Sequence, residues 1–198
     1  RDRPGEMVMY RFDGTTYVRT VVDPFGETHA KEILTADIDG DGKDELFSVI
    51  EAETDAQKNV VKPVEIRQYT LNDDGTFAHS TLATIDDRQT RFLVPGDFDG
   101  DGDVDLVAAA MKTGLWFITK GEEGWDKTLI DAISSGFEHT SYAADLDGDG
   151  KLELYVAADN QQELKAYRYN AEKKNFDKEL LGRLADNTIT WNITTGSM

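Results

Sequence analysis

One ten-residue pattern occurs three times in this chain and limits the folds that the chain can adopt. The pattern is Asp-x-Asp-Gly-Asp-Gly-x-x-[Asp/Glu]-Leu, and its copies occupy residues 37–46, 97–106 and 145–154. The copies start 60 and then 48 residues apart. A period of about 50 residues is typical of repeat proteins, in which each unit buries its apolar surface against its neighbours.

A second unit recurs four times and consists of an apolar alternating run, a polar turn and an aromatic residue that opens another run. The first runs are residues 7–12, 64–69, 115–119 and 164–169, and the aromatic residues are Tyr17, Phe77, Trp125 and Phe176. Alternating runs joined by short polar turns predict β-hairpins. The first three aromatic residues each lie 20 residues before an acidic copy, so we expect length variation elsewhere, mainly in residues 52–63.

Short apolar runs also stand directly before and after each acidic copy. Continuous short runs bounded by Gly and Asp predict strands that are buried on both faces, whereas the alternating hairpin strands should be half exposed. Together these runs give four strands in each unit. The sequence therefore predicts an all-β protein, a β-propeller built from four-stranded antiparallel blades with Asp-rich calcium loops.

The repeat predicts three full blades at about residues 31–85, 91–133 and 139–184. Residues 1–30 and 185–198 are expected to be parts of flanking or closing blades of the same propeller. In one alternative, a strand near residues 191–195 pairs with the hairpin of residues 7–22 and closes a four-bladed ring. In the other, which we favour, the chain is part of a larger ring that further blades or a second copy of the chain could complete.

The acidic copies predict calcium sites, because carboxylates packed this densely repel one another unless a cation binds between them. An Asp-x-Asp-x-Asp-Gly loop supplies carboxylates at positions 1, 3 and 5 and a backbone carbonyl at position 7. Position 12, where a helix-loop-helix site needs Glu, is Ser48, Ala108 or Val156, so an EF-hand is excluded. An acid stands at position 9 instead. The predicted ligands of three Ca²⁺ ions are Asp37, Asp39, Asp41, the Lys43 carbonyl and Glu45; Asp97, Asp99, Asp101, the Asp103 carbonyl and Asp105; and Asp145, Asp147, Asp149, the Lys151 carbonyl and Glu153.

The sixth residue of each copy is Gly42, Gly102 or Gly150, and we expect it at positive φ, where the loop turns sharply around the ion. The pattern, preceded by Gly or Ala and followed by a buried strand, resembles the FG-GAP/VCBS repeat. That family includes calcium-binding blades of integrin α-subunit propellers and of many bacterial surface proteins. The resemblance implies a β-propeller with calcium at the inner-strand turn of each blade.

Composition excludes several functions. The 21 Lys and Arg against 39 Asp and Glu give a net charge of −18, so nucleic-acid binding through a basic patch is not expected. The chain contains no Cys, which excludes disulfides, zinc ribbons and thiolate nucleophiles. No apolar run reaches the roughly 18 residues of a membrane span, so membrane insertion is not expected.

No residue is assigned to catalysis, because no hydrolase, phosphate-loop or zinc-protease motif occurs, and His29, His79 and His139 do not share a repeat position. We therefore expect a binding or adhesion module, extracellular, periplasmic or on a cell surface, that recognises a protein or glycan at one propeller face. A purely structural spacer is a further possibility. Certain polysaccharide lyases carry similar calcium loops in propeller folds, so a polysaccharide-active enzyme or its accessory domain is the alternative.

Overall fold

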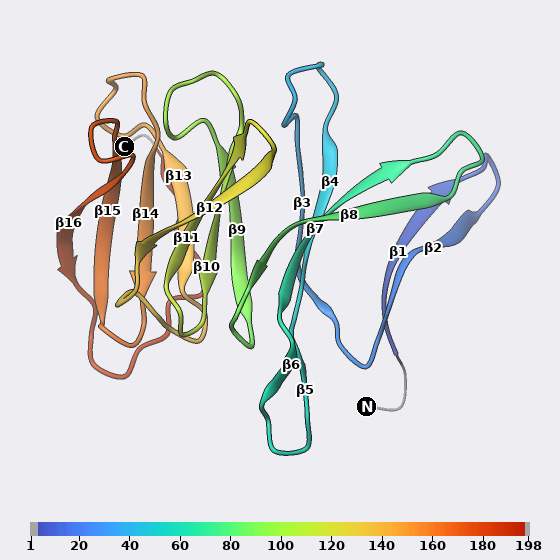
Figure 1. The fold of residues 1–198 in the computed structure, drawn as a ribbon, viewed down its shortest axis with the longest axis horizontal. Coiled ribbons are helices and arrows are strands. Elements are labelled where there is room, and N and C mark those ends of the chain that lie inside the picture. Colours follow the sequence, from blue (N-terminus) through green and yellow to red (C-terminus); the bar gives the residue numbers. More distant parts are fainter. Residues whose placement is uncertain (1–3, 197–198) are drawn as a thin grey trace.

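The computed structural model describes residues 4–196, and these residues form β-strands and connecting loops without any helix (Figure 1). The strands of the three four-stranded sheets are β3 (Ala30–Ala36), β4 (Glu45–Ile50), β7 (Val64–Leu71) and β8 (Phe77–Ile85); β9 (Thr90–Gly96), β10 (Asp105–Ala110), β11 (Leu115–Gly121) and β12 (Gly124–Asp131); and β13 (Thr140–Ala144), β14 (Glu153–Ala158), β15 (Glu163–Asn170) and β16 (Asn175–Arg183). The part of the chain that the structure describes therefore contains no helix long and apolar enough to cross a membrane.

Each of these sheets is antiparallel and follows the order of its strands in the chain. The first strand β9 contacts both β3 and β13, so these three strands form the inner edge of the assembly, and β8, β12 and β16 lie at the outer edge. This confirms the prediction of an all-β fold with three four-stranded antiparallel blades. The acidic loops join β3 to β4, β9 to β10 and β13 to β14, and all three lie at the same end of the molecule, at the top of Figure 1.

Two smaller elements complete the fold. Before the first blade, β1 (Gly5–Phe12) pairs with β2 (Tyr17–Gly26) in the predicted first hairpin. The segment predicted to vary in length contains β5 (Glu53–Thr54) and β6 (Val60–Lys62), a hairpin that extends from the end opposite the acidic loops (Figure 1).

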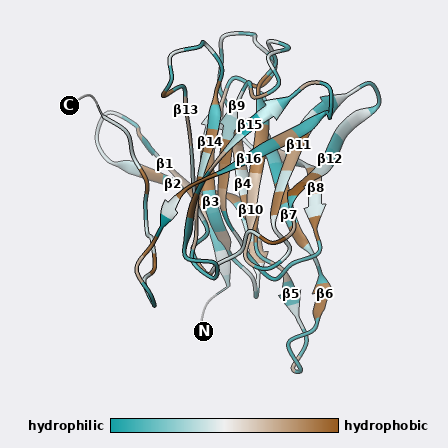
Figure 2. Ribbon diagram, turned by 90° about the vertical axis from the view of Figure 1, so that its left-hand side faces the viewer, coloured by the Kyte–Doolittle hydropathy of each residue, from teal (hydrophilic) through white to brown (hydrophobic). Residues whose placement is uncertain are grey.

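Apolar side chains fill the spaces between neighbouring blades, and the strands in the middle of the blades are the most hydrophobic (Figure 2). One cluster joins the first blade to the second through residues such as Phe47 and Ile118, and another joins the second to the third through Leu115 and Tyr167. A third cluster, which contains Met7, packs the first hairpin against the first blade. Each blade is therefore stabilised by its neighbours, as expected for a repeat protein.

Burial distinguishes the two strands that flank each acidic loop. Every residue of β10 and β14 is buried, as predicted for the strands after the loops. Of the strands before the loops, β9 buries Leu93 and Val94 as predicted, but the prediction is wrong for β3, in which no residue is fully buried and Ile33 is 52% exposed. All three strands before the loops are edge strands of their sheets, but β9 packs against both β3 and β13, whereas β3 packs mainly against β9.

The alternative in which residues 191–195 pair with the first hairpin is not observed in the described residues. Within residues 4–196, β1 pairs with β2 and with no other strand, and residues 184–196 contain no strand. Instead, the Thr190 amide donates a hydrogen bond to Asp159 Oδ1 (3.1 Å), and its carbonyl accepts one from Thr140 Oγ1. These contacts place Thr190 beside the third blade. The larger ring stays a prediction.

Candidate metal centres

The three acidic loops share one set of backbone hydrogen bonds, which fixes the direction of their carboxylates. In each loop the position-1 Asp accepts from the amide of the position-6 Gly, the position-3 Asp from the amide at position 5, and the position-5 Asp from the amide at position 7. The distances lie between 2.9 and 3.2 Å, and the acceptors are Asp37, Asp39 and Asp41; Asp97, Asp99 and Asp101; and Asp145, Asp147 and Asp149. In this shared set each Asp accepts through one oxygen. Asp97 and Asp145 also accept through Oδ1, from the amides of Gly100 and Gly148 at 2.8 and 2.7 Å, and Asp41 Oδ2 accepts from the Lys43 ammonium. A carboxylate oxygen has two lone pairs, so one that accepts a single hydrogen bond can still bind a ligand.

Glycine makes this turn possible. The position-6 residues Gly42, Gly102 and Gly150 have φ values of 85°, 96° and 87°, which confirms the predicted positive φ. The position-4 glycines Gly40, Gly100 and Gly148 also have positive φ, which the sequence analysis did not anticipate. L-residues with a side chain rarely adopt this conformation, so the Gly-x-Gly spacing lets the loop curl around its carboxylates.

The position-9 acid opens the strand after each loop and reaches back across the loop. Glu45 Oε2, Asp105 Oδ2 and Glu153 Oε2 accept hydrogen bonds from the position-2 amides of Ile38, Phe98 and Leu146, at 3.0, 3.2 and 3.2 Å. Asp105 and Glu153 are almost fully buried, with exposed fractions of 1% and 2%. This acid therefore ties the first half of the loop to the base of the second strand.

The structure brings most of the predicted ligands together. Ligand oxygens lie within 4.8 Å of one another in three groups: Asp37, Asp39 and Asp41; Asp97, Asp99 and Asp105; and Asp145, Asp147, Asp149 and Glu153. Glu45 and Asp101 are not in the groups of their loops. At position 7, Lys43, Asp103 and Lys151 are placed by their amides, and ligation by their carbonyls stays a prediction.

Electrostatics in the loops depends on burial. Burial raises the pKa of Asp105 to about 6, and the negative charge of Asp99 adds to this effect. Burial also raises the pKa of Asp99. In the first loop, a hydrogen bond from the Lys43 ammonium lowers the pKa of the exposed Asp41. The buried carboxylate is thus the one that is costly to ionise without a nearby cation.

Two buried oxygens show that the loops suit a hard cation. Asp37 Oδ1 and Asp105 Oδ1 are inaccessible to solvent and accept no hydrogen bond. A buried carboxylate oxygen without a partner is unfavourable, and a divalent cation would satisfy it. The donor set consists only of oxygens, which is the set that Ca²⁺ prefers.

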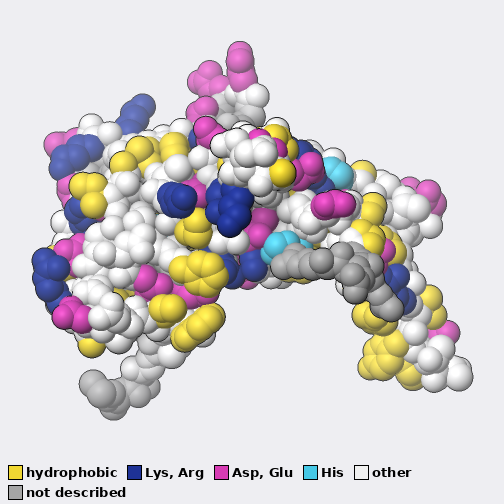
Figure 3. Space-filling view, turned by 90° about the horizontal axis from the view of Figure 1, so that it is seen from below, with side chains coloured by type: hydrophobic (Ala, Val, Ile, Leu, Met, Phe, Trp, Pro, Cys, Tyr) yellow, Lys and Arg dark blue, Asp and Glu magenta, His cyan; other side chains and the backbone are white. Residues whose placement is uncertain are grey.

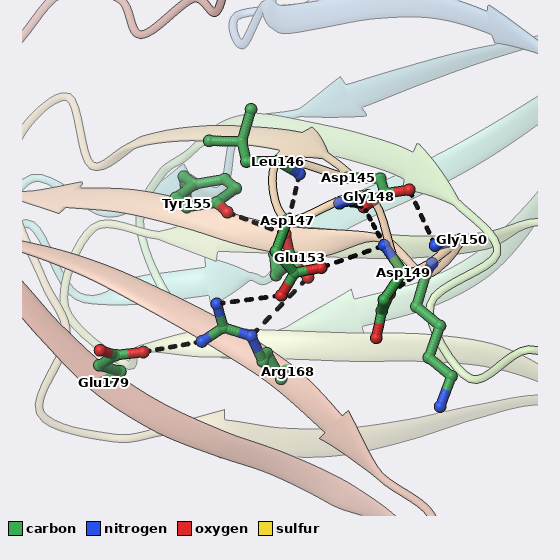
Figure 4. Close-up of polar contacts among 11 residues, drawn as sticks. Asp145, Leu146, Asp147, Gly148, Asp149, Gly150, Glu153, Tyr155, Arg168 and Glu179 are labelled. Atoms are coloured by element: carbon green, nitrogen blue, oxygen red, sulfur yellow. Dashed lines mark hydrogen bonds and ion pairs between the residues drawn. The ribbon is translucent and has the colours of Figure 1, made fainter.

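The third loop has an additional neighbour that the sequence analysis missed (Figure 4). Arg168 of β15 places its Nε 3.7 Å from Glu153 Oε1 and its Nη2 3.7 Å from Asp147 Oδ2. On the other side of Glu153, the Tyr155 hydroxyl donates a hydrogen bond of 2.8 Å to Oε2. The sequence alone does not place Arg168 beside the loop. Its position follows from the register of β14 and β15, in which Leu154 pairs with Tyr167.

The histidines lie apart from the acidic loops. His139 is buried between Ser134 and the Ala110 carbonyl, His79 lies in β8, and His29 precedes β3 and pairs with Glu51 at 2.9 Å. None of the three belongs to the carboxylate groups of the loops.

Comparison with protein families identifies the repeat. The model described as "FG-GAP-like repeat" matches residues 37–108 and 97–156, which together span 120 of the 198 residues. No curated protein matches the chain significantly. The chain belongs to the FG-GAP-like repeat family, and its four-stranded sheets are propeller blades.

Proposed function

We propose that this chain is a calcium-stabilised binding module that recognises a protein or glycan at the end of the blades opposite the acidic loops. The observation that carries the proposal is the separation of two kinds of surface. Exposed carboxylates gather in the loops at one end, where Leu146 of the third acidic loop is also exposed. The loops at the other end expose several apolar side chains, with Val61 64%, Ile133 67% and Phe137 47% exposed.

A groove supports this choice of face. It has a volume of about 890 Å³, and its walls include Thr28, Glu51, Val61 and Arg88. The space-filling view from this end shows apolar, basic and acidic side chains close together (Figure 3). Arg91 also lies over the Phe137 ring, 4.1 Å from its centroid, and so holds that exposed aromatic side chain in place.

Calcium has a structural role in this proposal. The ions would bind where each inner strand turns into the second strand of its blade, so they would fix the inner edge of each blade. Loops this exposed suit weak calcium sites, which function where calcium is abundant. We therefore place the module outside the cell or on its surface.

The test is binding to immobilised neutral and acidic polysaccharides and extracellular matrix proteins, in calcium and in chelator. We expect at least one ligand to bind in calcium, and binding to fall at least tenfold for Phe137→Ser. Leu180→Ser is the matched control, because Leu180 is 49% exposed but lies in β16 at the outer edge. A failure of every ligand to bind, or equal losses for the two variants, would contradict the proposal.

The groove also provides the one observation that favours the enzymatic alternative. His29 Nε2 lies 2.9 Å from Glu51 Oε2, and both residues line the groove together with Arg88. A base beside a cationic side chain is what a lyase acting on an acidic polysaccharide needs. Release of an unsaturated product by the wild type, lost in His29→Gln, would favour the enzyme over the binding module.

A further inference from the structure

The third acidic loop differs from the first two in the residue that the neighbouring strand places beside it. The Leu that ends each acidic copy pairs with an equivalent residue of the next strand: Leu46 with Tyr69, Leu106 with Ile118 and Leu154 with Tyr167. The residues that follow are Thr70, Thr119 and Arg168. One register position therefore holds a neutral hydroxyl beside two loops and a guanidinium beside the third.

The guanidinium of Arg168 lies between the loop and an acid on the outer strand (Figure 4). Two of its nitrogens are 3.7 Å from Asp147 Oδ2 and Glu153 Oε1, and both acids belong to the carboxylate group of the third loop. Its Nη1 donates a hydrogen bond of 2.8 Å to Glu179 Oε2 in β16. The Arg168 side chain is 43% exposed, so it has room to move between these partners.

The partners of the buried carboxylate oxygens also distinguish the third loop from the first two. The first and second loops each contain a buried carboxylate oxygen without a partner, Asp37 Oδ1 and Asp105 Oδ1. In the described residues of the third loop no oxygen of this kind is found, and the oxygen of Glu153 that accepts no hydrogen bond faces Arg168. The first loop also has a cation beside it, because the Lys43 ammonium lies 3.1 Å from Asp41 Oδ2. That ammonium is 81% exposed and pairs with one exposed carboxylate of its group, whereas Arg168 faces two carboxylates of the third loop, one of them the buried Glu153.

We propose that Arg168 competes with the divalent cation at the third loop, so that this site binds calcium more weakly than the other two and fills last. This inference rests on the proposed calcium role. A guanidinium within about 4 Å of two ligands repels an incoming Ca²⁺ and must be displaced from them, which we expect to weaken binding by about tenfold. Glu179 is the partner that retains the arginine when the ion binds.

The experiment is a calcium titration of the complete chain by isothermal calorimetry, with terbium luminescence as a second readout. We expect the wild type to show two tighter steps and one about tenfold weaker. Arg168→Thr installs the residue of the other two blades and should bring the weak step close to the tight ones. Arg168→Lys keeps the charge and should keep the weak step. Arg183→Thr is the control, because that exposed arginine pairs with Glu163 and should leave the titration unchanged.

Loop variants assign the weak step. Asp145→Asn should remove it, and Asp97→Asn should remove a tight one. The inference is overturned if the wild type and Arg168→Thr titrate alike, or if the weak step belongs to another loop. A wild type that binds no calcium overturns the proposed calcium role, and this inference with it. Circular dichroism of each variant without calcium checks that the blades are folded.

Discussion

Asp131 in β12 accepts a hydrogen bond of 2.8 Å from the Tyr167 hydroxyl in β15, and so joins the second blade to the third. Asp23 in β2 accepts an equivalent bond of 2.7 Å from Tyr69 in β7. At the same position of β8 stands Ala83, which packs in the apolar cluster between the first and second blades. A buried carboxylate therefore lies between the first hairpin and the first blade, and another lies between the second and third blades. The interface between the first and second blades is apolar at this position.

We predict that Asp131→Asn destabilises the chain by about 2 kcal/mol, because a buried cation then keeps only one of its two negative partners. Lys165 Nζ lies 3.8 Å from Asp131 Oδ2 and 3.2 Å from Glu163 Oε2, and the Lys165 side chain is only 3% exposed. Urea unfolding at constant calcium measures the free energy of unfolding. The control is Asp126→Asn, an exposed Asp on the same strand, which should change the stability by less than about 0.5 kcal/mol. Equal effects of the two variants would contradict this account of the interface.

His139 predicts a loss of stability in mild acid. Its Nδ1 lies 2.7 Å from the Ala110 carbonyl, which can only accept, so Nδ1 carries the proton and Nε2 accepts from Ser134 Oγ at 2.8 Å. Burial lowers the pKa of His139 from 6.5 to about 4. The neutral ring is therefore favoured in the folded state. Its contribution, at most about 3 kcal/mol, is complete above pH 6.5 and is lost as the pH falls from 6.5 towards 4.

The measurement is the free energy of unfolding at several pH values between 7.5 and 4.5, in saturating calcium. His139→Gln cannot titrate, so the difference in stability between wild type and variant should shrink as the pH falls. A difference that stays constant across this range would show that His139 does not carry the pH dependence.

The positive φ of the position-6 glycine predicts that replacing it lowers both stability and calcium affinity. Gly150 has a φ of 87° and open space around it, so Ala there is strained by its backbone and not by a clash. We expect Gly150→Ala to cost about 1 kcal/mol and to weaken calcium binding at the third loop. Gly182 also has open space but does not have positive φ, so Gly182→Ala should leave calcium binding unchanged. Urea unfolding and calorimetry report the two effects, and similar calcium affinities for both variants would contradict the explanation.

Much of the fold could be predicted because the chain repeats its own signals. Asp37, Asp97 and Asp145 each stand at the same distance from an aromatic residue of the preceding hairpin, so local spacing alone located the loops, the hairpins and the buried strands after them. The exposure of Ile33 was not predicted, because hydropathy does not show which strand lies at an edge.

The parts of the site that sequence analysis missed depend on contacts across strands. Arg168 follows its loop by a whole strand and a turn, and only the pairing of Leu154 with Tyr167 places it there. Likewise, Asp131 in β12 and Ala83 in β8 are recognised as equivalent positions only when the blades are aligned by strand register. The route of the segment around Thr190 follows from single hydrogen bonds to Asp159 and Thr140, which no pattern in the sequence encodes.

Scanning calorimetry with and without calcium tests most directly whether the acidic loops hold cations that stabilise the blades. We predict that the melting temperature of the wild type rises by at least 5 °C from chelator to millimolar calcium, because an ion that binds only the folded chain stabilises it. Removing one carboxylate from every loop, as Asp37→Asn, Asp97→Asn and Asp145→Asn together, should abolish most of this rise. A melting temperature of the wild type that is the same in calcium and in chelator would contradict the account.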